Sequence, residues 1–245
     1  MKLSLCTTCM DRLGDLKQTL PHNLAQARGF DVEWVILNYN SQDELATWAQ
    51  QELSEEIENG RVLHAHEQDT DVFHMGRSRN MAFRIATGEF VFNVDADNFL
   101  PDGFIARLFE MMKEVPTRLA AARSSRLMHG LIGFWKHDLI EELGGYDETF
   151  FGYGLDDRDL IERAKKLDFG FRTIGGKPSK VERLGQTRHV KWINYKSKVH
   201  LRQMQEDNRD IMMANLKAGR FKANEGRPWG AGKLLVNFDK EVILS

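Results

Sequence analysis

The first hundred residues alternate between short β-rich runs and helix-like segments. The β-rich runs are apolar and end at polar residues, whereas the segments between them carry apolar residues at helical spacing. This alternation is typical of a mostly parallel sheet flanked by helices on both faces. Ligands of such sheets bind beyond the carboxyl ends of the strands. The expected strands cover residues 3–8, 32–38, 61–66 and 89–94, and the expected helices cover residues 12–28, 41–57 and 76–86.

The second half is less regular and contains neither an internal repeat nor a low-complexity linker. The expected strands there are 119–123 and 131–135, and the expected helices are 137–143, 156–167 and 195–218. We therefore expect one α/β domain over residues 1–190. Residues 191–245 are expected to form a basic, largely helical C-terminal extension packed on that domain.

Composition places the chain among ordinary globular proteins. Hydrophobic residues make up 42% and charged residues 29% of the 245 positions, enough to bury a core without disulfides. No apolar run approaches the roughly 20 residues needed to cross a bilayer, and the N-terminus lacks a signal-peptide core, so we expect a cytoplasmic protein. Cys6 and Cys9 form a C-x-x-C, but Cys6 lies inside the first expected strand, which favours buried side chains over a redox pair.

Charge is distributed unevenly, although the formal net charge is only -2. Residues 1–171 contain 18 Lys and Arg against 29 Asp and Glu, whereas residues 172–245 contain 16 against 7. A basic tail can contact an anionic surface, here the inner membrane, as a peripheral protein does, or dock on the acidic part of its own chain. The sequence leaves both alternatives open. It contains no basic motif interleaved with aromatic residues, which argues against a nucleic-acid partner.

The β-rich run 89–94 leads directly into two carboxylates. Asp95 and Asp97 are two positions apart, so their side chains point the same way in an extended chain. Clustered carboxylates repel one another unless a cation lies nearby, and hard divalent cations share carboxylate oxygens with substrate phosphates. A D-x-D also occurs in solvated turns. Its position at the end of a buried strand in an α/β chain favours a metal site.

Further motifs accompany this D-x-D in a fixed order. They are Thr-Cys-Met-Asp-Arg at 8–12, Asn-Tyr-Asn-Ser-Gln-Asp at 38–43, Ser-Arg-Asn at 78–80 and Ala-Thr-Gly-Glu at 86–89. As an ordered set they resemble the nucleotide-sugar glycosyltransferases of the GT-A fold, in particular glycosyltransferase family 2. The resemblance implies an α/β, Rossmann-like, mostly parallel sheet flanked by helices, with a C-terminal helical extension.

The resemblance also implies roles on the side of the sugar donor. The residues that would bind a UDP-sugar lie at strand ends and in the Ser-Arg-Asn motif: Thr8, Asp11, Arg12, Asn38, Arg79 and Asp95. Thr8 and Asn38 would line the nucleobase site, and Arg79 would approach the diphosphate. Asp97 would bind the metal directly, and Asp95 would contact the metal or the ribose. The family usually has acidic residues at the positions of Asn38 and Tyr39. This difference from the family concerns which nucleobase the site would select.

A second informative segment combines glycines, aromatic side chains and acids within residues 144–159. Residues 131–167 closely resemble the galactosyltransferase C-terminal motif. By this resemblance Asp157 takes the place of the catalytic base, and Asp156 that of the acid that holds an acceptor hydroxyl. Tyr153 stands where the motif has tryptophan and would contact the acceptor. Trp135 is expected to border the sugar, with a position in the core as the alternative.

The related enzymes also use a late histidine as a metal ligand. His189 is the candidate here, and with Asp97 and Asp95 it would hold Mn²⁺ or Mg²⁺; a structural role for His189 is the alternative. His64 and His66 share one face of an expected strand without nearby acids, so we interpret them as structural.

The leading hypothesis is a metal-dependent, inverting glycosyltransferase. It would move a hexose or N-acetylhexosamine from a UDP-sugar to a hydroxyl of a glycan or glycolipid, in polysaccharide biosynthesis by inference from the family. One alternative is a sugar nucleotidyltransferase, which normally needs an early Gly-rich basic loop that residues 5–16 lack. The other is a carbohydrate-binding protein with a degenerate site, against which the intact acids argue.

Overall fold

The computed structural model describes residues 1–114, 117–122, 130–174, 181–184 and 198–245. Within these residues, nine strands form one sheet in the order β11-β10-β3-β2-β1-β4-β7-β6-β8, and two short strands, β5 and β9, pair separately. The strands of the large sheet are β1 (Leu3–Cys9), β2 (Val32–Tyr39), β3 (Val62–Glu67), β4 (Phe90–Asn93), β6 (Thr117–Ala122), β7 (Ile132–Trp135), β8 (Gly170–Ile174), β10 (Gly232–Val236) and β11 (Lys240–Leu244). The short strands are β5 (Asn98–Phe99) and β9 (Glu182–Arg183).

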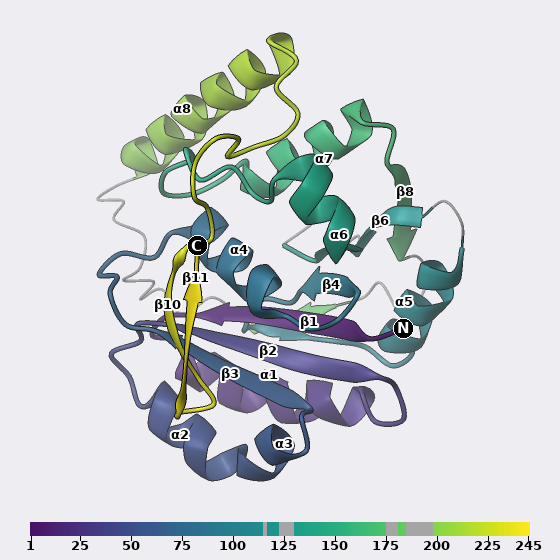
Figure 1. Cartoon of the computed structure of the whole chain (residues 1–245), viewed down its shortest axis with the longest axis vertical. Helices are drawn as coiled ribbons and strands as arrows, with labels where there is room; N and C mark the ends of the chain where they lie inside the picture. Colours follow the sequence, from purple (N-terminus) through teal and green to yellow (C-terminus); the bar gives the residue numbers. More distant parts are fainter. Residues whose placement is uncertain (115–116, 123–129, 175–180, 185–197) are drawn as a thin grey trace.

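The central four strands are parallel, as the alternating pattern predicts. β1 pairs in parallel with β2 and with β4, and β2 pairs in parallel with β3. β1 runs from the N-terminus towards the left side of Figure 1, so the carboxyl ends of all four strands face that side. β7 runs antiparallel to β4 and continues the sheet to β6 and β8.

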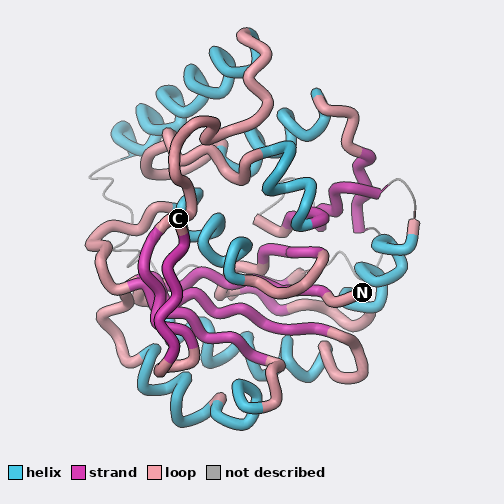
Figure 2. The backbone as a smooth tube through the Cα atoms, viewed as in Figure 1, coloured by secondary structure: helices cyan, strands magenta, loops and turns pink. Residues whose placement is uncertain are grey.

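Helices cover both faces of the sheet (Figures 1 and 2). Four helices pack on one face of the sheet, around one hydrophobic cluster: α1 (Leu13–Gln26), α2 (Leu45–Glu52), α3 (Ser54–Glu58) and α5 (Phe104–Lys113). The opposite face carries α4 (Met75–Ile85), α6 (Lys136–Asp138) with the π-helical turn η1 (Leu139–Leu143), and α7 (Asp156–Lys166). The alternation of β1 explains this arrangement, because Leu3 and Leu5 enter one cluster and Cys6 the other. Cys9 lies in the cluster opposite to Cys6, and both thiols are free and buried.

The expected helix 41–57 is interrupted. It forms as the two helices α2 and α3, and Ser41 does not cap it. Instead the Ser41 hydroxyl accepts a hydrogen bond from the Asp11 backbone N–H at 3.1 Å, while Asp43 accepts one from the Leu45 N–H at 3.2 Å. The first helix therefore begins at Leu45 and not at Ser41, because Ser41 connects the loop after β2 to the loop after β1.

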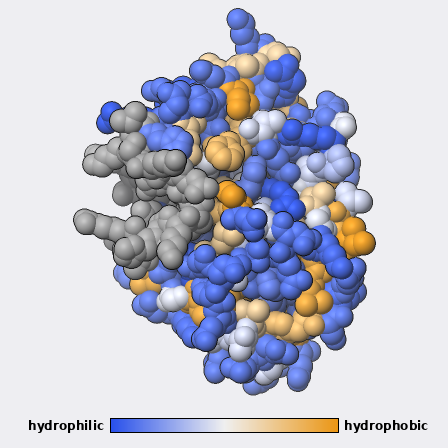
Figure 3. Space-filling view, turned by 90° about the vertical axis from the view of Figure 1, so that its left-hand side faces the viewer, coloured by the Kyte–Doolittle hydropathy of each residue, from blue (hydrophilic) through white to orange (hydrophobic). Residues whose placement is uncertain are grey.

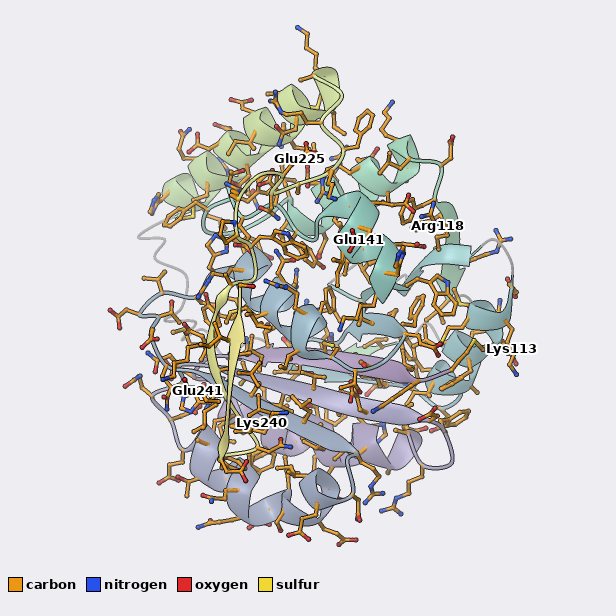
Figure 4. The ribbon with its side chains drawn as sticks, viewed as in Figure 1. Lys113, Arg118, Glu141, Glu225, Lys240 and Glu241 are labelled. Atoms are coloured by element: carbon orange, nitrogen blue, oxygen red, sulfur yellow. The ribbon has the colours of Figure 1, made fainter. Side chains whose placement is uncertain are left out.

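The C-terminal segment is helical only in part. α8 (Lys198–Lys217) agrees with the expected helix, but β10 and β11 form a hairpin that adds antiparallel to β3. The turn places Asn237 and Phe238 at φ 49° and 72°, and the Phe238 ring stacks on the buried His64 ring at 4.6 Å. Figure 4 shows Lys240 and Glu241 on β11 at the outer edge of the sheet. This hairpin departs from the expected largely helical extension, since its strands continue the sheet.

Among the described residues, three ion pairs join the basic tail to the acidic part of the chain, and one of them is Arg172 with Glu114 at 3.3 Å. Arg183 lies 3.1 Å from the carboxylate of Asp97, and Arg227 lies 3.2 Å from that of Asp147. In the described part of the chain, none of the helices has both the length and the apolar character that a bilayer span requires. The face towards which the parallel strands run is mostly hydrophilic where it is described, with small separate hydrophobic patches (Figure 3).

Candidate active site

Arg79 of α4 joins the two acidic motifs of the sequence. Its Nη1 donates to Oδ2 of Asp156 at 2.6 Å and to Oδ1 of Asp157 at 2.9 Å, and its Nη2 donates to Oδ1 of Asp95 at 3.2 Å. Arg79 is 4% exposed, so these contacts are made in a largely dry environment. One guanidinium thus holds the D-x-D of β4 and the start of α7 within a single cluster.

Helix α4 can present Arg79 this way because of how it begins and what it covers. His74 caps its N-terminus by accepting from the Arg77 N–H at 3.1 Å, and the helix packs over β1 and β2. The Tyr146 ring lies beneath the guanidinium, with a centroid distance of 5.3 Å. Three carboxylates oppose the burial cost and keep the pKa of Arg79 well above its ordinary value, so this side chain is a permanent cation.

Asp157 has the perturbed protonation expected of a group that exchanges protons. Burial raises the pKa of Asp157 to about 7, Arg79 opposes that rise, and the neighbouring charges of Asp156 and Asp95 add to it. Burial also raises the pKa of Asp156. The Tyr146 hydroxyl donates to Oδ1 of Asp157 at 3.0 Å, which orients this carboxylate.

Gly130 allows the acidic cluster to close. A Cβ at this position would lie 2.7 Å from Nη2 of Arg79 and 2.8 Å from Oδ2 of Asp95, and its backbone has φ 72°. Its carbonyl also accepts from Nδ2 of Asn93 at 2.7 Å, and the same amide donates to Asp95 at 3.0 Å. Sequence analysis did not single out Gly130, because the fold alone brings it to β4.

The carboxylate of Asp97 is 2% exposed and lies between two arginines. Nη2 of Arg12 is 3.4 Å from Oδ2, and Nη2 of Arg183 is 3.1 Å from Oδ2 and 3.3 Å from Oδ1. Asn98 follows directly, is fully buried, and its side-chain amide has no hydrogen-bond partner among the described residues. Sequence analysis assigned Arg12 to the binding of the UDP-sugar and did not single out Arg183.

These residues fit a divalent cation. The buried carboxylate of Asp97 already tolerates positive charge at contact distance, and Asp95 lies two positions away on the same strand end. Mg²⁺-like ions are typically held by one or two carboxylates together with substrate phosphates and water. Among the described residues no group of three or more His, Cys, Asp or Glu side chains could hold a metal. The predicted third ligand, His189, lies outside the described residues.

The residues predicted to line the nucleobase site lie together at the carboxyl ends of β1 and β2. Thr8 and Cys9 pair with Leu37 and Asn38 across the two strands. Asn38 is 1% exposed, and its Nδ2 has no hydrogen-bond partner in the part of the chain that the structure describes. Asp11 follows at φ 55° and accepts from the Gln42 N–H at 2.6 Å. The structure thus brings Thr8, Asp11 and Asn38 to one edge of the sheet.

The predicted acceptor residues separate into two groups. Tyr153 lies close to the acidic cluster: burial raises its pKa, the charge of Asp156 adds to the rise, and Arg183 opposes it. Trp135 lies elsewhere. It pairs with Phe90 at the beginning of β4 and packs edge-on against the Phe90 ring at 5.5 Å. The structure therefore favours the alternative, a position against the core, because β7 runs antiparallel to β4 and places Trp135 at the opposite end of the strand from the D-x-D.

The C-terminal segment holds the loop that carries Tyr146. Nδ2 of Asn224 donates to the carbonyls of Gly144 and Tyr146 at 2.8 and 2.7 Å, and its Oδ1 accepts from the Glu148 N–H at 3.1 Å. A Cβ at Gly144, which has φ 64°, would collide with the Ala223 carbonyl. Figure 4 labels Glu225 in this returning segment. No local signal in residues 219–230 announced this contact, since its partners are distant in sequence.

The sheet and the site together define a class of fold. A mixed sheet with four parallel strands at its centre, helices on both faces and carboxylates beyond strand β4 are the features of the GT-A, Rossmann-like fold. Residues 4–157 match the sequence pattern described as Glycosyl transferase family 2. This span is well over half of the chain, so the protein belongs to that family. None of the curated proteins matches the chain in sequence.

Solved structures with the same fold have low sequence identity to this chain. A fragment of S. aureus TarS has a TM-score of 0.57 at 16% identity, over 72% of this chain and 59% of its own. PcManGT, a mannosyltransferase from Pyrobaculum calidifontis with GDP-Man and Mn²⁺, has 0.63 at 18%, over 86% and 64%. A Drosophila β-1,4-galactosyltransferase 7 mutant with manganese, UDP-Gal and xylobiose has 0.55 at 14%, over 83% and 79%. At these identities the likeness concerns the fold.

Proposed function

We propose that the protein is a metal-dependent, inverting glycosyltransferase. It moves a hexose or N-acetylhexosamine from a UDP-sugar to a hydroxyl of a glycan or glycolipid. One observation supports this most directly: Arg79 contacts Asp95 on the donor side and Asp157 on the acceptor side with the same guanidinium. A carboxylate able to accept a proton and a D-x-D able to hold a diphosphate through a cation therefore belong to one site.

Asp157 is the proposed general base. Its pKa of about 7 matches a base that accepts the proton of the acceptor hydroxyl near neutral pH. The hydrogen bond from Tyr146 leaves Oδ2 of Asp157 as the oxygen for that proton. Asp156 and Tyr153 are proposed to hold the acceptor. A base on the acceptor side implies attack on the face of the anomeric carbon opposite to the leaving diphosphate, and hence inversion.

The donor is proposed to lie between the loops after β1 and β2 and the end of β4. Thr8, Asp11 and Asn38 would contact the nucleoside, and Asp97, Asp95 and His189 would hold Mn²⁺ or Mg²⁺. When bound, the cation stabilises negative charge on the departing diphosphate as a Lewis acid. Arg79 and Arg12 add fixed positive charge on this side of the site.

Several of the structural neighbours support a nucleotide-sugar donor. TarS is described with UDP and with UDP-GlcNAc, the galactosyltransferase with UDP-Gal and manganese, and the mannosyltransferase with GDP-Man and Mn²⁺. This chain spans about three fifths of the TarS fragment, 59%, so its substrates are proposed from its own residues first. Asn38 offers an amide where the family usually has acids, so the selectivity for the nucleobase should be tested with both UDP and GDP.

Two measurements test the proposal: a screen of nucleotide sugars for hydrolysis with and without Mn²⁺, and the melting temperature of the protein with UDP. We expect UDP to raise the melting temperature only when Mn²⁺ is present, because ligand binding stabilises the folded state by mass action. A carbohydrate-binding protein with a degenerate site would show no such metal-linked stabilisation. Metal-independent binding of every nucleotide tested would contradict the proposal.

We also propose a cytoplasmic location, with the basic tail as the surface for any peripheral membrane contact. Arg183 and Arg227 already pair with Asp97 and Asp147, so part of the tail's charge is used within the molecule. Flotation with vesicles of anionic and neutral lipids tests the contact. Equal recovery with both vesicle types would exclude an electrostatic contribution.

A further inference from the structure

We propose that Arg183 exchanges partners when the donor binds. In the free protein it neutralises Asp97. Once a divalent cation occupies Asp97, the guanidinium of Arg183 leaves this carboxylate and binds the diphosphate of the nucleotide sugar instead. This role rests on the proposed function, and it assigns a donor-binding and metal-regulating residue that neither the family match nor the D-x-D motif identifies.

The backbone around Arg183 is held independently of its side chain. β9 pairs antiparallel with β5 and places Arg183 opposite Asn98, and the Leu184 N–H donates to the Asp97 carbonyl at 2.9 Å. The strand that carries Arg183 is thus attached to the main chain of the D-x-D itself. Because these contacts do not involve the guanidinium, the side chain can change its partner while the backbone stays in place.

The two arginines on Asp97 differ in how far their side chains are exposed. Arg12 also pairs with Asp15, one turn into its own helix, and its side chain is 17% exposed. The Arg183 side chain is 30% exposed and lies close enough to Tyr153 to lower that residue's pKa against the effect of burial. Arg183 therefore contacts Asp97 and lies near Tyr153 of the acidic loop.

A divalent cation on Asp97 would repel both guanidinium groups that contact this carboxylate, and the side chain of Arg183 is the more exposed of the two. Asp97 is 2% exposed, and a buried carboxylate requires a counter-charge when no metal is present. A cation bound to Asp97 removes that requirement, and it brings phosphate oxygens within reach of Arg183. Phosphate is a preferred partner of the planar guanidinium, which can bind it through two parallel hydrogen bonds.

This exchange predicts opposite effects on two binding equilibria. Replacing Arg183 with alanine removes a competitor for Asp97, so Mn²⁺ alone should bind about tenfold more tightly. The same replacement removes a charged contact to the diphosphate, so UDP at saturating Mn²⁺ should bind roughly tenfold more weakly. A merely structural role would change both affinities in the same direction or change neither.

Isothermal titration of the full chain measures both equilibria. Mn²⁺ is titrated in the absence of nucleotide, and UDP is titrated at saturating Mn²⁺, for wild type, Arg183→Ala and Arg183→Lys. Lysine keeps the charge but not the fork, so we expect wild-type Mn²⁺ affinity and intermediate UDP affinity. Arg61→Ala is the control, because Arg61 forms a more exposed ion pair with Glu56 at 3.3 Å, next to the beginning of β3.

The outcomes separate this role from the proposed function. If wild type does not bind UDP with Mn²⁺, the proposed function fails and the role of Arg183 fails with it. If wild type binds both normally, but Arg183→Ala fails to tighten Mn²⁺ binding or fails to weaken UDP binding, the exchange alone is overturned. Circular dichroism of each variant checks that the fold is retained.

Discussion

Asp97 and Asp157 are both carboxylates with arginine partners, yet the two sites hold their arginines differently. The partners of Asp97 come from the start of α1 and from the two-residue strand β9, and their side chains are partly exposed. The partner of Asp157 comes from the middle of α4, is almost fully buried, and contacts two further carboxylates. The first arrangement suits a counter-charge that a ligand replaces. The second suits a permanent charge that sets the protonation of its neighbours.

The largest effect is expected from Asp157→Asn. The amide cannot accept the proton of the acceptor hydroxyl, so kcat should fall by roughly 10²–10⁴. Binding of UDP with Mn²⁺ should stay near its wild-type value, which titration calorimetry can check. Asp168→Asn, at an exposed position after the other end of the same helix, serves as the control and should leave kcat unchanged. Equal activity of both variants would remove Asp157 as the base.

Arg79→Ala and Arg183→Ala compare the two arginines directly. Loss of Arg79 leaves three carboxylates near one another without their shared cation, so the free energy of unfolding should drop by about 3–5 kcal/mol. Loss of Arg183 should cost about 1 kcal/mol or less, since Arg12 still contacts Asp97. Urea unfolding of both variants measures the difference. Similar losses would show that the two counter-charges are held alike.

Asn224→Gly tests whether the C-terminal segment supports the loop of Tyr146, which orients Asp157. Asn224 has φ 57°, and glycine accepts this backbone conformation, so the variant removes the side-chain hydrogen bonds to Gly144, Tyr146, Glu148 and Arg227 without straining the backbone. We expect a loss of roughly 1–3 kcal/mol in unfolding free energy. We also expect a lower kcat, because Tyr146 orients Asp157. Wild-type values for both would show that the loop holds its shape without the tail.

The smallest expected effect is a shift in the pH profile. A protonated Asp157 cannot act as a base, so kcat/KM should fall as the pH drops below about 7. The charge of Asp156 raises the pKa of Asp157, so Asp156→Asn should move the midpoint to lower pH. A midpoint that stays in place or moves upward would mean that another group limits the rate.

The strand end and helix start that carry the acidic residues were largely predictable because their signals are local. The pattern of apolar residues defines β4, and two carboxylates follow it directly, so the end of that strand and its chemistry come from the same few positions. Asp156 and Asp157 were predicted at the start of a helix for a similar reason, and α7 begins there. Parallel strands then place all carboxyl ends at one edge.

Contacts between distant segments could not be predicted in this way. The meeting of Asp95, Asp156 and Asp157 on Arg79 depends on how α4 and α7 pack, and the pair of Arg183 with Asp97 depends on the pairing of β5 with β9. β7 runs antiparallel to β4, so Trp135 lies at the end of the strand pair away from the D-x-D. A strand's own sequence does not say whether its neighbour runs parallel or antiparallel.

Local sequence thus determined which chemical groups the protein has and which strand ends and helix starts carry them. Tertiary packing decided which groups share a site, how far each is buried, and therefore how it is charged. Burial and neighbouring charges, which raise the pKa of Asp157 to about 7, arise only when residues far apart in the chain exclude water together.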